Sequence, residues 1–391
     1  ALLDPFASLL LGMDYADPAV RPLLDRALAP LAPGARLRVV GTDPHLPVHL
    51  APWARARGHR VDGDVITRGD AADRRLAGAQ RAGEPGTVVD HPPAEWGLAA
   101  RGALIEDGGP PLPLADLDRR DEVWADLAPR LYAQAAAGQW DPATAVDWAH
   151  PGLPDDVESA VVQLMTYLIE NELAALTVPA RFLARIHPHF REVVQFLATQ
   201  LADEARHVEV FTRRACLSGR PLGVSGAGGR ASLQTLLDEP DWATASFLLS
   251  VLGEGTFLSL LAFLDRYAPD PVTSRIARLA LQDEARHVAF ALGHLGEHLA
   301  ADRHYRNRLR AATERRHDAL ASTSGLSPAV HDALVVVAAG SWAPEAIAAG
   351  WARVQSLQAE MDEGRRRRLL RLGFSDAEAT ELSALHTRNF M

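Results

Sequence analysis

Two segments of this chain carry almost the same eight residues. Leu201–Val208 reads LADEARHV and Leu281–Val288 reads LQDEARHV. Each contains Glu-x-x-His, and residues three apart on a helix lie on one face, so each pair can present a carboxylate and an imidazole to the same point. The two pairs are Glu204 with His207 and Glu284 with His287. Apolar residues at helical spacing flank both pairs, which predicts that both face the interior of a helical bundle.

A carboxylate also lies near the middle of the apolar segment before each motif. Glu254 is the single charged residue in Thr244–Leu264, a stretch long enough to span a bilayer. An unpaired carboxylate is costly in lipid, so we interpret this segment as a buried core helix. In the earlier segment Glu172 is preferred over its rival Glu170, because the face around Glu172 is apolar and that around Glu170 carries Gln163.

Four helices would then each provide a glutamate, and two of them would add a histidine. This is the ligand set of ferritin-like di-iron carboxylate bundles. The candidate ligands are Glu172, Glu204, His207, Glu254, Glu284 and His287. Four carboxylates balance the charge of two Fe²⁺ ions, and oxygen ligands with imidazole suit Fe or Mn. We therefore expect two Fe ions per chain, with an Mn/Fe pair also compatible; the alternatives are Glu/His pairs on solvated faces and a metal-free bundle.

The paired DEARH strings resemble those of bacterial multicomponent monooxygenase hydroxylases, the ribonucleotide reductase small subunit and acyl-carrier-protein desaturases, over about residues 155–300. The resemblance implies a set of residues around the ligands. Asp203 would orient His287, Asp283 would orient His207, and Arg206 and Arg286 would hold the two Asp carboxylates. Ordinary i,i+3 surface pairs are the alternative for each Asp–Arg.

Several positions depart from these relatives. Phe211 stands where the reductase subunit has its radical-forming Tyr, and Leu258 stands where the hydroxylases place a Thr. Ala280 stands where the p-aminobenzoate N-oxygenases place a further His ligand. The resemblance thus implies a non-haem di-iron, O₂-activating oxygenase without a stable tyrosyl radical. Its substrate would be small and apolar or aromatic, and the reaction hydroxylation, N-oxygenation or desaturation; a ferroxidase or iron-handling protein is the alternative.

Two further features bear on the chemistry. Gly253 and Gly255 flank Glu254 inside the expected helix. They either leave room for substrate beside the metals or permit a π-bulge there. The alternative is that they allow close helix packing. No flavin or nicotinamide fingerprint is evident, so electrons would come from an external donor such as a ferredoxin or a reductase. The arginines at Arg365–Arg368 and Arg371 are either a solvated helix end or a docking surface for that donor.

Composition limits the remaining classes. The 391 residues include 50 acidic residues against 40 basic ones, all of them Arg, for a net charge of -10. This balance argues against a nucleic-acid binder. Cys216 alone allows no intramolecular disulfide, and the sequence given does not open on a signal peptide. We expect a cytoplasmic protein that does not enter a membrane, and a homodimer is compatible with these features.

The chain changes texture near residue 120. Before it, short β-like runs are separated by Gly, Pro and Asp: Leu37–Val40, Asp64–Thr67, Thr87–Val89 and Ala103–Ile105. After it, a 3.6-residue apolar period predicts helices near 121–137, 155–179, 189–217, 241–267, 271–299, 303–320, 328–338, 343–363 and 375–386, with a Gly-rich connection over 218–240. The expected fold is mainly α: a mixed α/β lobe over 1–120, then a ferritin-like helical domain with C-terminal accessory helices over 121–391.

Overall fold

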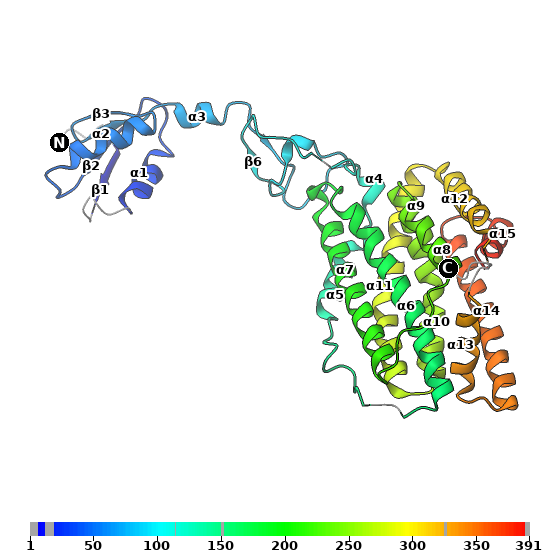
Figure 1. Ribbon diagram of the computed structural model, residues 1–391. Helices are drawn as coiled ribbons and strands as arrows, with labels where there is room; N and C mark the ends of the chain where they lie inside the picture. The colour runs from blue at the N-terminus through cyan, green and yellow to red at the C-terminus, as the bar shows by residue number, and fades with distance from the viewer. Residues whose placement is uncertain (1–6, 12–18, 114, 150–151, 324–326, 388–391) are drawn as a thin grey trace. The chain divides into compact units, whose positions relative to one another are not determined.

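The computed structural model describes residues 7–11, 19–113, 115–149, 152–323 and 327–387 (Figure 1). Its contacts divide the chain into two compact units. The first unit comprises Ala1–Thr87 with Glu95–Pro111, and the second comprises Val88–Ala94 with Leu112–Met391. The fold is mainly helical with a small N-terminal mixed sheet, as the sequence predicts.

The first unit is built on a four-stranded sheet of order β1-β2-β4-β3. β1 (Ala7–Leu10) runs parallel to β2 (Arg36–Val40), whereas β4 (Val65–Thr67) is antiparallel to both β2 and β3 (Arg60–Asp62). Alternate residues of β2 face opposite sides of the sheet, and the buried set packs under the helices. The buried residues of β2 join buried residues of α1, α2 and β4 in a small core of this unit, which includes Leu24, Leu28, Leu37, Val39, Leu50 and Ile66.

The helices of this unit are α1 (Val20–Leu28), α2 (Leu46–Ala56) and α3 (Ala71–Arg75). After α3, the short strand β5 (Gln80–Arg81) pairs with β6 (Leu104–Ile105), and the 3₁₀ turn η1 (Ala94–Trp96) lies between these two strands in the sequence. The β-like run Thr87–Val89 is not a strand, so that expectation was wrong. Its β-branched residues have no neighbouring strand to pair with, and Val89 N–H instead donates to His189 Nε2 at 3.1 Å.

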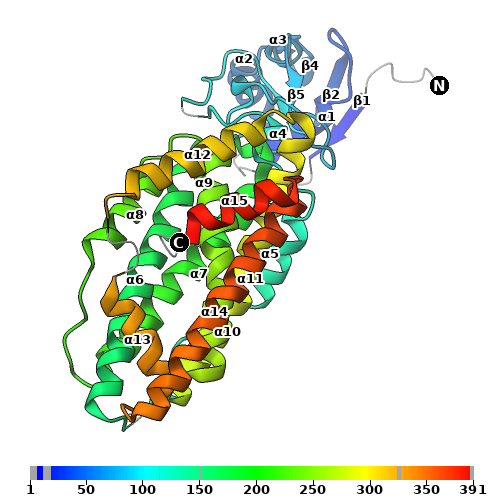
Figure 2. The same ribbon diagram turned by 90° about the vertical axis from the view of Figure 1, so that its right-hand side faces the viewer.

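Four long helical segments form the bundle of the second unit, and they lie side by side in Figures 1 and 2. They are α6 (Asp155–Leu183), α7 (Arg191–Cys216), α11 (Pro271–Ala301), and a continuous segment in which α9 (Trp242–Ser246) leads through the π-helical η3 (Phe247–Glu254) into α10 (Gly255–Tyr267). The main hydrophobic core of the protein lies between these segments.

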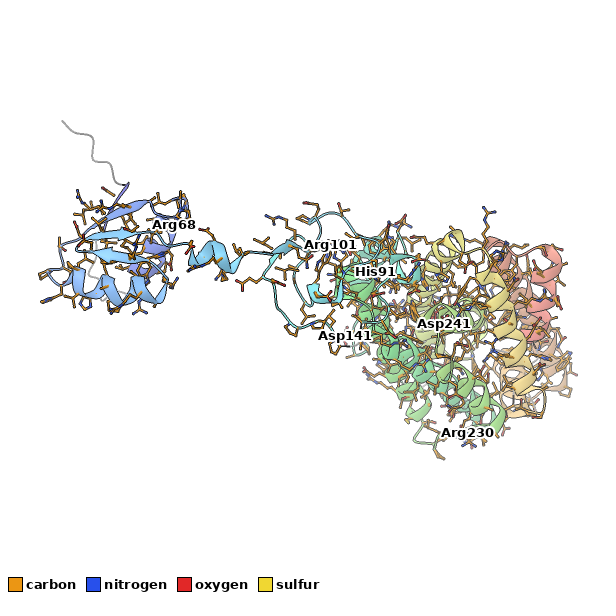
Figure 3. All side chains as sticks on the ribbon, turned by 90° about the horizontal axis from the view of Figure 1, so that it is seen from above. Arg68, His91, Arg101, Asp141, Arg230 and Asp241 are labelled. Atoms are coloured by element: carbon orange, nitrogen blue, oxygen red, sulfur yellow. The ribbon has the colours of Figure 1, made fainter. Side chains whose placement is uncertain are left out.

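Side-chain caps fix where two of these segments begin. The carboxylate of Asp270 accepts a hydrogen bond from Thr273 N–H at 2.8 Å, and Pro271 occupies the first turn of α11, where its missing N–H costs nothing. The carboxylate of Asp241, labelled in Figure 3, accepts from Thr244 N–H at 2.8 Å at the start of α9. Both caps satisfy amide donors that a helix end leaves unpaired.

A buried ionic network ties three of the helices together at one end of the bundle. Arg214 of α7 donates to both carboxylate oxygens of Glu158 of α6 at 2.8 Å. The same guanidinium donates to Asp270 at 3.0 Å and to Thr273 Oγ1 at 2.9 Å, both at the start of α11. The Arg214 side chain is fully buried, so removal of one partner would leave an uncompensated charge, a change that typically costs about 3–5 kcal/mol.

Shorter helices surround the bundle: α4 (Arg120–Val123), α5 (Ala128–Ala137), η2 (Pro188–Phe190), α8 (Ala227–Leu237), α12 (Tyr305–Leu320), α13 (Pro328–Ala339), α14 (Pro344–Arg371) and α15 (Asp376–Thr387). Two expectations need correction. The region 121–137 is two helices, because the backbone at Trp124 is extended and Asp126 N–H donates to Glu297 at 2.6 Å. The Gly-rich connection 218–240 contains α8, which buries Ser232 and Leu236.

The apolar segment around Glu254 is the one described helix long and apolar enough to cross a membrane. It runs from Trp242 to Tyr267, and 83% of its most apolar window is buried inside the protein. This burial agrees with its interpretation as a core helix.

Candidate metal centre

Six acidic and imidazole side chains converge in the middle of the bundle. They are Glu172 of α6, Glu204 and His207 of α7, Glu254 of η3, and Glu284 and His287 of α11. Each is at most 6% exposed. The two Glu-x-x-His pairs meet because residues three apart share a helix face, and that face is turned inward on both helices. Glu170, the rival to Glu172, belongs to neither of the two ligand groups found among the described residues.

The six side chains form two overlapping groups, each with ligand atoms within 4.8 Å of one another. One group contains Glu172 and His207, the other contains Glu254 and His287, and Glu204 and Glu284 belong to both. His207 Nδ1 lies 3.3 Å from Glu204 and 3.2 Å from Glu284. His287 Nδ1 lies 3.0 Å from Glu204 and 3.3 Å from Glu284. This arrangement offers two adjacent positions for metal ions with two shared carboxylates between them.

The polar atoms of the cluster have few hydrogen bonds of their own. Both carboxylate oxygens of Glu254 and of Glu284, one of Glu204, and Nδ1 of His287 are buried without a hydrogen-bond partner among the described residues. Leaving such groups unpaired costs about 1–3 kcal/mol each, and more for charged ones. Two divalent cations would satisfy these atoms and balance four carboxylates, so the residues fit a pair of metal ions.

Without metal, protons must compensate part of the negative charge. Burial, reinforced by the charge of Glu204, raises the pKa of Glu172 well above its ordinary value; burial and the charge of Glu284 do the same to the pKa of Glu254. Burial alone would lower the pKa values of both histidines. The charge of Glu172 outweighs this effect at His207, and that of Glu204 outweighs it at His287, so both pKa values are raised well above 6.5.

Metal binding should therefore displace protons. Protons bind more tightly than usual to Glu172, Glu254, His207 and His287, because their pKa values are raised, and a metal ion competes with these protons. Filling both positions should release protons, and the apparent affinity should rise with pH. Titration calorimetry with Mn²⁺ in buffers of different ionisation enthalpy measures the number released. An affinity that does not change between about pH 6 and pH 8 would contradict these pKa shifts.

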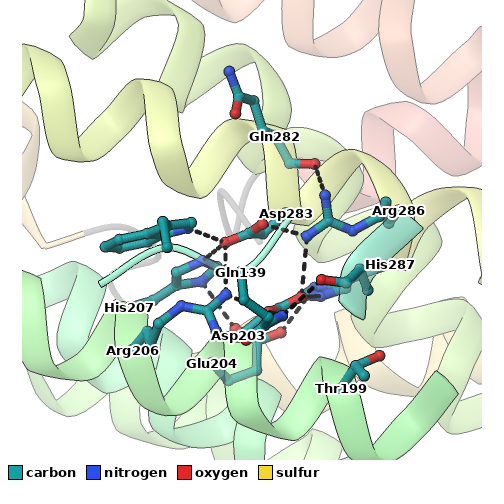
Figure 4. Close-up of polar contacts among 12 residues, drawn as sticks. Gln139, Thr199, Asp203, Glu204, Arg206, His207, Gln282, Asp283, Arg286 and His287 are labelled. Atoms are coloured by element: carbon teal, nitrogen blue, oxygen red, sulfur yellow. Dashed lines mark hydrogen bonds and ion pairs between the residues drawn. The ribbon is translucent and has the colours of Figure 1, made fainter. Parts of the chain in front are cut away.

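The outer nitrogen of each histidine contacts an aspartate from the other motif helix (Figure 4). His207 Nε2 lies 3.2 Å from Asp283 Oδ2, and His287 Nε2 lies 3.2 Å from Asp203 Oδ2. Each aspartate therefore acts across the helix pair, the crossed arrangement that the family resemblance implies. With Nε2 hydrogen-bonded to a carboxylate, Nδ1 of each ring is directed to the cluster.

Two arginines hold these aspartates. Arg206 contacts Asp203 closely and reaches Asp283 at 3.2 Å; Arg286 contacts Asp283 closely and reaches Asp203 at 3.3 Å. Burial opposes ionisation of Asp283, but its contact with His207 outweighs this and lowers its pKa. The pKa of Asp203 is lowered in the same way by His287. The Asp–Arg pairs are thus buried and shared between helices, which differs from isolated i,i+3 surface pairs.

Two residues that the motifs do not indicate complete this layer. Trp140 Nε1 donates to Asp283 Oδ2 at 2.8 Å, and Gln139 Nε2 donates to Asp203 Oδ1 at 3.1 Å. Both follow α5, far from the motifs in sequence. Only the pairing of α5 with α7 and α11 brings them here, and a local pattern gives no signal for it.

Replacing Asp283 by Asn should weaken metal binding about 10–100-fold while leaving the helical fold intact. The amide keeps the shape of the side chain but loses the charge that two arginines and His207 require. Anaerobic Fe²⁺ titration with circular dichroism as a fold check measures this. Asp332→Asn, at a position whose side chain is 79% exposed, is the matched control. Equal affinities in the two variants would show that Asp283 has no influence on the metals.

The Glu254 segment differs from the other three because it is a π-helix. A π-turn spaces its hydrogen bonds more widely than an α-turn and occurs frequently at functional sites. Arg368 of α14 donates from Nε to the carbonyl of Val251 at 2.7 Å. A Cβ on Gly255 would lie 2.4 Å from that same Nε, so this glycine is needed for the close approach of Arg368. Both interpretations of the flanking glycines, a π-bulge and close packing, therefore apply to this segment.

No protein-family model and no curated protein sequence matches the chain. Solved structures of R2-like ligand-binding oxidases are similar to it. One with an anaerobically reconstituted Mn/Fe cofactor is 18% identical, with a TM-score of 0.42, and the match covers 68% of this chain and 94% of that one. Another, with an aerobically reconstituted Mn/Fe cofactor after a long soak, is also 18% identical with a TM-score of 0.42, and the match covers 68% of this chain and 93% of that one.

The structure itself shows which side chains the centre could use. Four helical segments surround one buried cluster, each contributes a glutamate, and two also contribute a histidine. The cluster offers ligands for two metal ions, which suits a pair of Fe ions or an Mn/Fe pair. This arrangement matches the ligand pattern of ferritin-like di-metal carboxylate bundles.

Proposed function

We propose that this protein is a non-haem di-iron oxidoreductase of the monooxygenase type. It would use O₂ to hydroxylate, N-oxygenate or desaturate a small apolar or aromatic organic substrate. The observation that supports this most strongly is the pair of overlapping ligand groups sharing Glu204 and Glu284. When bound there, two adjacent redox-active metal ions supply the electrons that reduce O₂.

The chain's own residues prepare the site for that chemistry. Glu172 and Glu254 are the outer carboxylates of the two groups, and Glu204 and Glu284 lie between them. Asp203 and Asp283 fix the tautomers of the two histidines, so that each presents Nδ1 to the cluster. The surrounding core excludes bulk water, which would otherwise compete for oxidising equivalents.

The residues near Glu254 support an apolar substrate body. Phe247, Phe257 and Leu261 are buried on the same helical segment. The phenyl ring of Phe211 lies with its centroid 6.3 Å from that of His207, in the place where a radical-forming relative has a phenol. The protein therefore lacks this built-in phenol to consume oxidising equivalents, which leaves them for a bound substrate.

Electrons and substrate would both come from outside the protein. We propose a ferredoxin or reductase as donor, a cytoplasmic location, and a homodimer as the assembly. The arginine run is not one docking surface, as the sequence allowed, because Arg365 is buried and Arg368 is turned toward Val251. Arg367 is exposed but paired with Glu363 at 3.3 Å, and the exposed Arg371 is the member that would meet an acidic donor.

Anaerobic loading with Fe²⁺ followed by O₂ uptake tests the proposal. The loaded protein should contain about two ions per chain and, with a chemical reductant, consume O₂ faster when aromatic or aliphatic test compounds are present. Incorporation of ¹⁸O from ¹⁸O₂ into a test compound identifies oxygen transfer. A large shell on size-exclusion chromatography, with O₂ consumed only to oxidise added Fe²⁺, would instead establish the iron-handling alternative.

A further inference from the structure

The π-helical turn that ends at Glu254 is bonded to another helix through its backbone. The N–H of Gly255 donates to the carbonyl of Ser250, five residues earlier. In an α-helix the same N–H would bond to the carbonyl of Val251, four residues earlier. That carbonyl accepts a hydrogen bond from Nε of Arg368 at 2.7 Å. A side chain of α14 therefore occupies the acceptor that α-helical pairing of this turn would need.

The helix that carries Arg368 is fixed in the protein. It packs along η3 and α10, and Figure 2 shows α14 beside α10. Three of its residues belong to the main hydrophobic core: Leu357, Met361 and Leu369. The position of the Arg368 guanidinium relative to the Glu254 turn is thus set by helix packing, unlike that of an arginine on a solvated helix end.

Two glycines make room for this guanidinium. A Cβ on Gly255, the first residue of α10, would lie 2.4 Å from Arg368 Nε. A Cβ on Gly364, within α14, would lie 3.2 Å from Arg368 Nη1. Glycine inside a helix costs about 1 kcal/mol relative to alanine. The chain carries this cost on both helices where it allows the close approach of Arg368 to the turn.

The charge of Arg368 is directed at a carbonyl. The part of the chain that the structure describes gives Arg368 no carboxylate partner, and its Nη2 is buried without a hydrogen bond. Burial, followed by repulsion from Arg365 and Arg367, lowers the pKa of Arg368 to about 9, so its guanidinium is still charged at neutral pH. A charged donor forms a stronger hydrogen bond than a neutral one. The bond to Val251 therefore favours the π-helical pairing of the turn over the α-helical one.

We propose that Arg368 is a positioning residue for Glu254: by holding the Val251 carbonyl, it keeps the turn in the register that directs the Glu254 carboxylate to the cluster. A shift of one residue turns a helical side chain by about 100°. Glu254 belongs to one ligand group only, together with His287. Arg368 therefore supports the metal position that contains Glu254, and the position that contains Glu172 does not depend on it. This inference rests on the proposed function, because it concerns the same pair of metals.

Arg368→Gln should lower the metal content from about two ions per chain to about one. Elemental analysis of the full chain loaded with Mn²⁺ without air measures the content. Arg367→Gln is the matched control, because Arg367 is the neighbouring residue, 68% exposed and paired with Glu363 at 3.3 Å. The control should keep both ions. Loss of neither ion or of both ions in Arg368→Gln, or an equal loss in the control, would overturn the proposal.

The spectrum of the bound Mn²⁺ separates the loss of one position from a general weakening. Two Mn²⁺ ions that share carboxylates are magnetically coupled, which broadens their electron paramagnetic resonance signal, whereas an isolated ion gives resolved hyperfine lines. Arg368→Gln should give the isolated-ion spectrum, as should Glu254→Gln. A mixture of coupled pairs and empty chains in Arg368→Gln would show that both positions weaken together, and the positioning role would be wrong.

Gly255→Ala tests the same contact from the other helix. The added methyl group would displace the Arg368 guanidinium, although alanine by itself favours a helix by about 1 kcal/mol. This variant should therefore lose the same single ion. Gly253→Ala is its control, because a Cβ there would meet the Leu248 carbonyl at an ordinary contact distance of 3.5 Å. Two ions in Gly255→Ala would contradict the proposal, and this pair of variants decides the matter if Arg368→Gln does not fold.

O₂ uptake with organic test compounds, measured on Fe²⁺-loaded samples of the same proteins, keeps the two proposals apart. Two ions in the unaltered protein and one in Arg368→Gln, without O₂ uptake, would support the positioning role and overturn the proposed oxidase. Two ions in both proteins, with O₂ uptake, would overturn only the positioning role. An unaltered protein that binds no metal would overturn both.

Discussion

Replacing Glu204 by Gln is expected to reduce the metal content from about two ions per chain to less than one. Glu204 belongs to both ligand groups, and its two oxygens lie between the two histidines, near Nδ1 of each. An amide carries no negative charge and binds Fe²⁺ poorly, so one substitution weakens both metal positions. Elemental analysis after anaerobic reconstitution measures the loss.

A second pair of variants separates a shared ligand from an outer one. Glu172→Gln removes a carboxylate that belongs to one group only, so it should lower the content to about one ion per chain. Glu209→Gln, on the exposed side of the same helix as Glu204, should retain both ions. If Glu204→Gln and Glu172→Gln lose equal amounts of metal, the two carboxylates do not differ in the way that the geometry indicates.

Replacing Phe211 by Tyr should produce a tyrosyl radical that the unaltered protein does not form. The new phenol would lie beside His207, within a fully buried part of the core. Oxidising equivalents generated at the metals then have a nearby group to oxidise when no substrate is bound. Electron paramagnetic resonance after O₂ exposure of the Fe²⁺-loaded variant should show the radical in a readily quantified fraction of the chains.

The existing tyrosines should not give this signal. Burial raises the pKa of Tyr167, which favours its neutral phenol, and its ring meets that of Phe257 edge-on. Phe211→Leu, which changes the packing without adding a phenol, is the control. A lasting, stoichiometric tyrosyl signal in the unaltered protein would favour a reductase-like radical generator over an oxygenase.

The sequence contained most of what determines the bundle and its cluster, because those features are local. The 3.6-residue period placed the long helices, and the spacing in Glu-x-x-His placed two ligands on each of two inward faces. Glu254 stood out as a lone charge in an apolar segment. The choice of Glu172 over Glu170 depended only on which face of one helix is apolar.

Other features depended on which helices meet, and a single sequence does not show that. Trp140 contacts Asp283 across 143 positions. Arg368 reaches Val251 across 117 positions, and a run of four arginines ordinarily indicates a solvated helix end. In the same way, α8 was missed because glycines at its start conceal a helix that forms against α6 and α12.

The contact between Arg368 and Val251 also has a consequence for the order of assembly. The carbonyl of Val251 lies three residues before Glu254, and its donor is provided by a helix near the end of the chain. During synthesis, α6, α7, η3 and α11 emerge before α14, so a nascent chain can gather the six candidate ligands without this hydrogen bond. The Glu254 turn is completed only when α14 docks, which makes correct placement of this ligand a late, non-local event in folding.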